Sequence, residues 1–314
     1  MSFTSANYSL AQQQELEAVQ GHQMIPLPSA ILFTCLAPLT VLGNGLLLLI
    51  FTKNTVSLLR TPSNFFIFNM AFANFLTGAV LQPLLAYRYY YLYLSKGPLL
   101  MTLRKVMLAF SIVTMNVSII SVCAFSWDSF LALSQPIKHR NWMTVRRAKV
   151  LIFCTWVYQI GFASMLFTRI PLPLVLKTDL YVNTTLVASL LLLSYFFLYK
   201  AFTKRERRRA RSFSTPNLQL RHFRVIRRGT SMEKRMRKII FLFTLVTTIP
   251  IIPVTVVWYV TGHCVRCQRY QPLVLTEKVL NQLVFVKFVL DPFVYAWRLE
   301  RYRRALKKML CYIQ

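Results

Sequence analysis

Residues 288–295 read Phe-Val-Leu-Asp-Pro-Phe-Val-Tyr and place a carboxylate, Asp291, and a proline, Pro292, inside an apolar run. The run lies in a window, 274–297, of about 20 mostly apolar residues, the length that an α-helix needs to cross roughly 30 Å of hydrocarbon. Six similar windows occur near residues 29–52, 63–86, 103–127, 148–168, 183–203 and 237–260. The sequence therefore predicts an all-α membrane protein, a bundle of seven transmembrane helices.

The composition favours the same class. Hydrophobic residues make up 55% of the chain and charged residues 15%, and the mean hydropathy is +0.46, which is typical of a bilayer protein. The net charge of +29 is also compatible with nucleic-acid binding, but the basic residues flank the apolar windows instead of alternating with stacking aromatics. Attraction to anionic membrane lipids accounts for them more simply.

The distribution of Lys and Arg predicts the orientation. When basic residues at the window ends are counted with the adjoining segments, 28 of the 38 fall on one side of the membrane and 9 on the other, and Lys287 lies within the seventh window. Because the basic side is normally cytoplasmic, we expect an extracellular N-terminus and a cytoplasmic C-terminus, in the plasma membrane.

These windows divide the chain into three parts. Residues 1–28 are an extracellular N-terminus that lacks the layout of a cleaved signal peptide, and 29–297 are the seven-helix domain, with a basic cytoplasmic loop at about 204–236. Residues 298–314 have the spacing of a short basic amphipathic helix on the inner membrane surface, with a disordered tail as the alternative. Cys311 at its end is either a palmitoylation site or an unmodified thiol.

Two glycosylation sequons, at Asn7 and Asn183, fall on the expected outer side. A third, at Asn116, lies inside the third window and is a chance match. The two outer sequons agree with the orientation inferred from charge.

Five short motifs, each in its own window, carry a resemblance to a known family. They are Gly43-Asn44, the run 69–74 (Asn-Met-Ala-Phe-Ala-Asn), the run 128–133 (Asp-Ser-Phe-Leu-Ala-Leu), Trp156, and the run 291–295 (Asp-Pro-Phe-Val-Tyr). In this order they resemble the rhodopsin-like family of G-protein-coupled receptors. The resemblance implies an extracellular ligand, and a heterotrimeric G protein or arrestin as cytoplasmic partner.

The chain departs from the family pattern at three positions that matter for signalling. Ser129 stands where the family has the arginine of its Asp-Arg-Tyr triplet, which puts coupling through Asp128, Ser129 and Phe130 in doubt. Arg104 stands where the family has a disulfide-forming cysteine. Thr247-Thr248 replaces the family's Cys-Trp, so the aromatic switch of the sixth helix is missing.

The resemblance also gives Asp291 a context. In the family, an aspartate of the second span and an asparagine of the seventh share a sodium site, whereas here the two have exchanged places as Asn74 and Asp291. The resemblance adds Asn44 and Ser118 as neighbours, and Tyr295 as the end of the seventh-span motif. These residues, with Lys287 and Pro292, form the expected polar cluster of the core.

An isolated charge at membrane depth costs roughly 2.5–3.5 kcal/mol, so Asp291 needs a partner. Lys287 lies four residues earlier and therefore on the same helix face. We hypothesise that its ammonium replaces the sodium ion; the alternative is a Lys287 that snorkels or faces a water-filled vestibule, beside a neutral Asp291. Pro292 has no amide hydrogen, which predicts a kink at that point.

The resemblance places a ligand pocket at Ser111, Ile251, Ile252, Thr255, Asn281 and Phe285. Ser111 stands where amine receptors have an aspartate, so a biogenic amine is not expected. A ring of basic residues around the pocket mouth indicates either an anionic or lipid-like ligand or an ordinary interfacial charge ring.

Two further motifs lie outside the helices. Cys264 and Cys267 form a Cys-x-x-Cys pair on the outer side, similar to a loop of adenosine-type receptors, and predict a short disulfide; His263 adds too few ligands for zinc. In the basic loop, Ser212 and Ser214 lie in a sequence that resembles 14-3-3 binding sites, so phosphorylation there would recruit a 14-3-3 protein at Ser214.

The motifs contain no Ser/His/Asp set, no cluster of metal ligands and no phosphate loop, so neither an enzyme nor a cofactor is expected. The sequence predicts a receptor that transmits ligand binding by shifting its helices. Two alternatives stay open: a non-signalling scavenger or dimerisation partner, which Ser129 permits, and an ion or proton transporter using Lys287 and Asp291.

Overall fold

The computed structural model describes residues 26–53, 61–94, 101–213, 242, 245–264, 266–267 and 270–298, and of residues 205–206, 208–213 and 295–298 it describes the backbone alone. Asn7, Ser214, Cys311 and the expected amphipathic helix beyond residue 298 lie outside the described residues. Ser212 and Tyr295 are described by backbone only, in α10 and α13.

Six continuous helices of the described residues are long and apolar enough to cross a membrane. They are α2 (Pro26–Lys53), α4 with η1 and α5 (Pro62–Leu76, Thr77–Leu81, Gln82–Tyr93), α6 (Met101–Ser134), α8 with η2 (Val145–Ser164, Met165–Phe167), α9 with η3 and α10 (Leu172–Thr178, Asp179–Leu186, Val187–Phe213), and Leu245–His263. A short helix, α7 (Pro136–Trp142), follows α6. These helices overlap the first six apolar windows, although the fifth begins at Leu172, before its window of 183–203, and the prediction of an all-α bundle is confirmed.

The seventh window forms two helices, α12 (Gln271–Leu283) and α13 (Val286–Arg298), joined by a turn at Val284 and Phe285. Around this turn the backbone bonds tighten to three-residue spacing, with the amides of Phe285 and Lys287 donating to the carbonyls of Gln282 and Val284. The helix is therefore interrupted at this turn, whereas α13 continues through Pro292. The kink expected at the proline stays a prediction.

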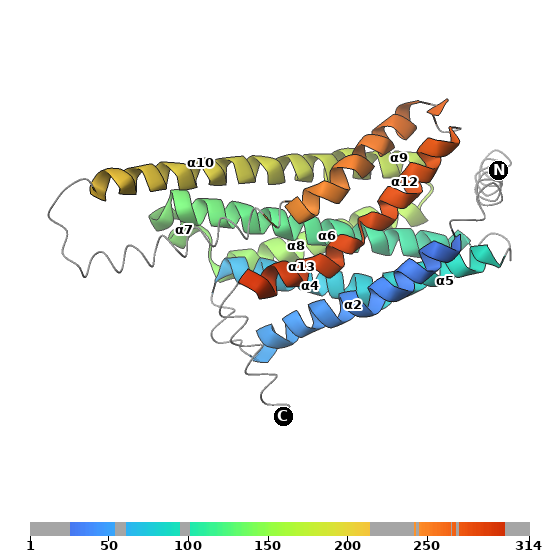
Figure 1. Ribbon diagram of the computed structural model, residues 1–314, viewed down its shortest axis with the longest axis horizontal. Helices are drawn as coiled ribbons and strands as arrows, with labels where there is room; N and C mark the ends of the chain where they lie inside the picture. Colours follow the sequence, from blue (N-terminus) through green and yellow to red (C-terminus); the bar gives the residue numbers. More distant parts are fainter. Residues whose placement is uncertain are drawn as a thin grey trace.

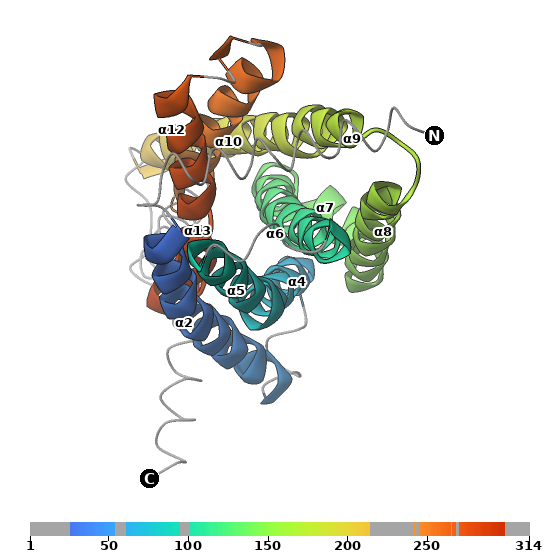
Figure 2. The ribbon, with the colours of Figure 1, turned by 90° about the vertical axis from the view of Figure 1, so that its right-hand side faces the viewer.

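In Figure 1, α6 and α10 run along the long axis of the bundle and α2 and α12 are inclined to it, and the end view places α6 in the interior (Figure 2). Buried side chains of α6 contribute to three apolar clusters: Val122 packs with α2, α4 and α10, Met107 with α2, α5 and α13, and Ile112 with α8 and α9. Apolar side chains on the outer faces, such as Leu42 at 70% and Phe153 at 68% exposure, suit contact with lipid.

The second membrane helix contacts α2 closely at Gly78. This glycine lies in the π-helical segment η1, and a Cβ atom there would come within 2.8 Å of the Thr40 side chain. Real Cβ atoms do not approach other atoms so closely, so a larger residue would force the two helices apart. Glycine at this position therefore allows the first two membrane helices to lie close together.

Candidate functional site

A buried ion pair lies at the centre of the polar core. The ammonium nitrogen of Lys287 is 2.6 Å from Oδ2 of Asp291, one turn along α13, and the two side chains are 1% and 0% exposed. Side chains on a helix lean toward its N-terminus, which directs Asp291 back toward Lys287. At 1% exposure Lys287 does not face a water-filled vestibule, so the geometry favours the pairing hypothesis over its alternative.

Two other helices supply hydrogen bonds to this pair. Lys287 donates to Oγ of Ser118 in α6 at 3.0 Å, and the amide of Asn74 in α4 donates to Oδ2 of Asp291 at 2.8 Å. Ser118 and Asn74 are fully buried. The four side chains thus join the second, third and seventh membrane helices through charge-assisted bonds, which are stronger than bonds between neutral groups.

Asn44 and Pro292 belong to the same region but act on the backbone. Because Pro292 lacks an amide hydrogen, the carbonyl of Phe288 has no donor four residues ahead, and the side-chain amide of Asn44 donates to this carbonyl at 2.9 Å. A Cβ on Gly43 would lie 3.2 Å from the proline ring, so glycine permits this approach. The proline's missing bond is supplied by α2, which explains why α13 continues through Pro292.

The residues present do not fit the sodium ion that the family resemblance implies. The Lys287 ammonium already contacts both the carboxylate and the Ser118 hydroxyl, which are oxygen atoms that a cation would use. A second cation about 4 Å from the ammonium would be repelled by about 4 kcal/mol at an effective dielectric constant of 20. The Lys287 nitrogen thus lies where the family pattern would have its cation.

A second polar group lies where α6 ends. Asp128 is fully buried, its Oδ1 is 2.7 Å from Nε2 of His139 in α7, and the Ser63 hydroxyl at the start of α4 donates to its Oδ2. The sequence did not indicate His139 or Ser63 as partners, because their contacts with Asp128 depend on how α7 and α4 pack. Asp128 thus pairs with residues of α7 and α4, and not with an arginine next to it in the sequence.

Ser129 and Phe130 have local roles in the structure. The Ser129 hydroxyl donates to the carbonyl of Phe125 at 2.8 Å, one turn back in α6. The Phe130 ring packs against Trp127 and Phe197, with ring centroids 5.8 and 5.7 Å away. A serine bonded to its own helix cannot extend toward a cytoplasmic partner as an arginine would.

The residues expected to line a ligand pocket have varied surroundings. Ser111 donates to the Met115 sulfur at 3.3 Å, Ile251 is buried, and its neighbour Ile252 is 47% exposed. The Thr255 hydroxyl donates to the Ile251 carbonyl, Asn281 is partly buried, and Phe285 packs edge-on against Phe33 of α2, centroids 5.1 Å apart. The ligand pocket stays a prediction.

Glycosylation at Asn183 does not fit the structure. Asn183 lies within η3, is 2% exposed, and its amide nitrogen donates to Asp179 at 2.8 Å. A glycan must attach to that nitrogen and extend into solvent, whereas here the membrane helix begins earlier than expected, at Leu172. The expectation failed because Asp179 and Asn183 were assigned to a loop and the edge of the fifth window.

Asn183 instead belongs to a polar cluster that the sequence did not reveal. The Asn116 amide donates to Asp179 at 2.9 Å and to Gln159 at 3.2 Å, and Gln159 donates to Asn183 at 3.2 Å. These side chains link α6, α8 and η3. Polar residues at membrane depth in three neighbouring windows were the available signal.

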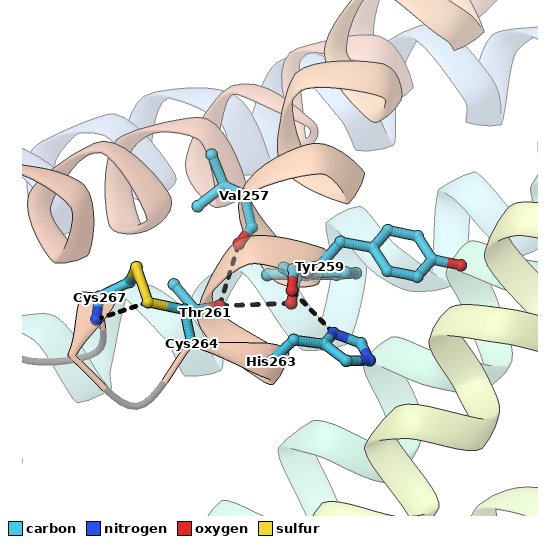
Figure 3. The surroundings of a disulfide bond; sticks show 7 residues. Val257, Tyr259, Thr261, His263, Cys264 and Cys267 are labelled. Atoms are coloured by element: carbon cyan, nitrogen blue, oxygen red, sulfur yellow. Dashed lines mark hydrogen bonds between the residues drawn. A yellow bond between two sulfur atoms is a disulfide. The ribbon is translucent and has the colours of Figure 1, made fainter.

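Cys264 and Cys267 form a disulfide in the turn that follows the Leu245–His263 helix (Figure 3). The helix end is held by side chains: Thr261 donates to the carbonyl of Val257 at 3.1 Å, and Nδ1 of His263 lies 2.9 Å from the carbonyl of Tyr259. Nε2 of His263 is 2.8 Å from the Tyr181 hydroxyl of η3. The described residues contain no group of three or more potential metal ligands.

The fold is a seven-helix membrane bundle with a buried polar site that joins its second, third and seventh helices. The structure superposes on squid rhodopsin with a TM-score of 0.74 at 17% identity, covering 93% of this chain and 87% of that one. Residues 43–171 match the family model "7 transmembrane receptor (rhodopsin family)".

Three named receptors are similar in sequence to parts of this chain. The chain is 31% identical over 121 residues to a muscarinic acetylcholine receptor of Drosophila melanogaster and 36% identical over 119 residues to a probable G-protein coupled receptor of Amphibalanus amphitrite, each alignment covering 38% of this chain. It is 28% identical over 152 residues, 47% of this chain, to 5-hydroxytryptamine receptor 2C of Canis lupus familiaris. The alignments span only 14%, 24% and 31% of these relatives. The chain is therefore similar to the rhodopsin-like family of G-protein-coupled receptors, with the family model matching residues 43–171.

Proposed function

We propose that the chain is a plasma-membrane receptor that converts binding of an extracellular ligand into a shift of its membrane helices, to which a cytoplasmic G protein or arrestin responds. The observation that carries the proposal is the Lys287–Asp291 pair, which lies on α13 and is hydrogen-bonded to α4 and α6. A charged group shared by three helices favours discrete arrangements, because separating it from its partners leaves a charge unpaired. A ligand acts by binding one arrangement better than another.

The same geometry supports the tethered cation as the resting state of this receptor. In the family pattern a mobile sodium ion fills the core, whereas here the ammonium is covalently attached one turn from the carboxylate. Its occupancy does not vary with the salt concentration. The receptor would therefore keep the same balance of states in sodium and in potassium solutions.

The ligand is expected not to be a biogenic amine. Muscarinic and serotonin receptors appear among the relatives by name, yet Ser111 replaces the aspartate that amine receptors use, and its hydroxyl is directed to Met115 of its own helix. An ammonium ligand would lack its counter-ion there. The basic residues near the outer helix ends favour an anionic or lipid-like ligand instead.

One observation favours a second function, a receptor that binds ligand without activating a G protein. Ser129 is bonded to the Phe125 carbonyl, and Asp128 is already paired with His139, so the usual arginine contact has no counterpart among the described residues of this triplet. Such a chain would act as a scavenger or as a dimerisation partner. The expected roles of Ser212 and Ser214 in 14-3-3 binding suit either function.

Nucleotide exchange on purified G proteins separates the two. The full chain in lipid nanodiscs is compared with Ser129→Arg, and with Ser134→Arg as a control that adds the same charge at the exposed end of α6. Ligand-independent exchange by the wild type, raised by Ser129→Arg but not by Ser134→Arg, supports a signalling receptor. If neither the wild type nor Ser129→Arg promotes exchange on any G-protein class, the non-signalling function is the better one.

A further inference from the structure

A groove lies between the end of α6, the short helix α7 and the start of α8. Figure 2 shows α7 between these two long helices. The groove has a volume of about 770 Å³ and has two kinds of wall. Lys138 and Arg146 lie on its polar side, and Trp142, Met143, Val150 and Leu151 on its apolar side.

Four basic residues line the groove, and two of them have hydrogen-bond partners in the structure. His139 is paired with Asp128, and the Arg147 guanidinium donates to the carbonyls of Trp142 and Asn141 at 2.5 and 3.5 Å, where it caps the C-terminus of α7. Lys138 and Arg146 are exposed and have no hydrogen-bond or ion-pair partner among the described residues. Two positive charges of the groove are therefore available to a ligand.

The apolar wall faces lipid. Val150 and Leu151 are 54% and 48% exposed on a helix that spans the membrane, and Trp142 is 69% exposed in α7, just before that helix begins. Tryptophan in this position is typical of the boundary between hydrocarbon and water. The groove therefore runs from headgroup depth, beside Lys138 and Arg146, into the acyl-chain region along α8.

We propose that this groove binds a phospholipid of the inner leaflet whose headgroup carries a phosphate monoester, with the phosphate between Lys138 and Arg146 and an acyl chain along Val150 and Leu151. A phosphate monoester has a charge of about −1.5 to −2 at neutral pH, which matches two cations better than the single charge of a phosphodiester does. Arginine and lysine bind phosphate oxygens through charge-assisted bonds. The proposal rests on the orientation inferred above, in which this end of the bundle is cytoplasmic.

A water-soluble phosphate compound fits the groove less well. It would satisfy Lys138 and Arg146 but leave the apolar wall unused, and a lipid molecule already present in the membrane needs no transfer from solution. Binding would also affect how α7 packs against α6, because His139 of α7 is paired with Asp128 of α6. A lipid that contacts α7 and α8 together stabilises the arrangement in which α7 lies against α6.

The experiment is native mass spectrometry of the purified full chain, titrated with phosphatidylinositol 4-phosphate, with phosphatidylinositol as the lipid that lacks the monoester. Lys138→Gln and Arg146→Gln are each expected to weaken binding of the monoester lipid about tenfold, the usual worth of one hydrogen bond to a charged group. The matched control is Lys149→Gln, which removes the same charge from α8 outside the groove, over the ring of Phe65. It should change the affinity less than twofold.

A third variant, Leu151→Trp, fills the apolar wall without changing charge and should weaken binding of the long-chain lipid several-fold. Equal affinity for the two lipids, or an equal loss in all three charge variants, overturns the proposal in favour of general surface attraction. Tight binding of free inositol 1,4-bisphosphate would identify a soluble anion as the ligand and also overturn it. The melting temperature checks folding; if Arg146→Gln does not fold, Lys138→Gln carries the test. Because lipid binding is measured without a G protein, its failure is distinct from a failure of receptor signalling.

Discussion

Replacing Lys287 with methionine should convert the polar core from a site that does not bind sodium to one that does. Methionine keeps the unbranched shape but removes the ammonium, so Asp291 retains the Asn74 amide as its one hydrogen-bond donor among the described contacts. Removing one partner of a buried ion pair typically costs about 3–5 kcal/mol. The vacated position lies between the carboxylate and the Ser118 hydroxyl, which are suitable oxygen ligands for a small cation.

The magnitude follows from mass action. A cation that binds only the folded state stabilises it by about 2.7 kcal/mol when its free concentration is 100 times its dissociation constant, so sodium should recover a large part of the loss in Lys287→Met. The double variant Lys287→Met, Asp291→Asn removes both charges and should be less destabilised than either single variant. It should also be insensitive to sodium, because it has no carboxylate.

The assay is the melting temperature of the purified chain in sodium chloride and in choline chloride at equal ionic strength. The wild type should melt at the same temperature in both salts, and Lys287→Met should melt higher in sodium. Sodium-dependent stability of the wild-type chain would refute the tethered cation. A single variant no less stable than the wild type would refute the buried ion pair itself.

Three further predictions concern packing and modification. Gly78→Ala should destabilise the chain by about 1–3 kcal/mol because its Cβ would overlap α2. The control Gly161→Ala, with no atom within 4 Å of the new Cβ, should be neutral or slightly stabilising. The melting temperatures of the two variants are compared, and equal losses would contradict the packing argument. Asn44→Ala should lower stability by about 1–3 kcal/mol because the Phe288 carbonyl loses its donor, and unchanged melting would count against that bond. Asn183→Gln should leave the electrophoretic mobility of the protein from mammalian cells unchanged, while Asn7→Gln should remove a glycan; a shift with Asn183→Gln would show that this side chain is accessible.

The sequence was sufficient for the helices and for the centre of the site. Apolar windows of membrane length have one common solution, a helix whose backbone bonds are internal, so the existence and approximate positions of these helices followed from hydropathy. The pairing of Lys287 with Asp291 also followed, because both lie on one helix face and neither charge is stable alone at membrane depth. Such features depend on residues that are close together in the chain.

Features that depend on contacts between helices could not be predicted in this way. The missing hydrogen bond at Pro292 could be read from the sequence, but the donor that replaces it comes from Asn44, 244 residues away from Phe288. The pairing of Asp128 with His139 requires the turn between α6 and α7. Asn183 was placed on the outside because hydropathy does not show that a helix with polar residues facing its neighbours continues beyond the apolar window.

The turn at Val284 and Phe285 divides the seventh helix into two parts, each of which is bonded separately to α2. Its inner part, α13, is fastened to the first helix by the Asn44 amide and by the contact of Gly43 with the Pro292 ring. The base of its outer part is fastened by Gln282, which donates to the Ser29 hydroxyl at 2.7 Å. A displacement of the outer end of α12 would therefore pivot about this turn, and α2 would hold the chain on both sides of the pivot.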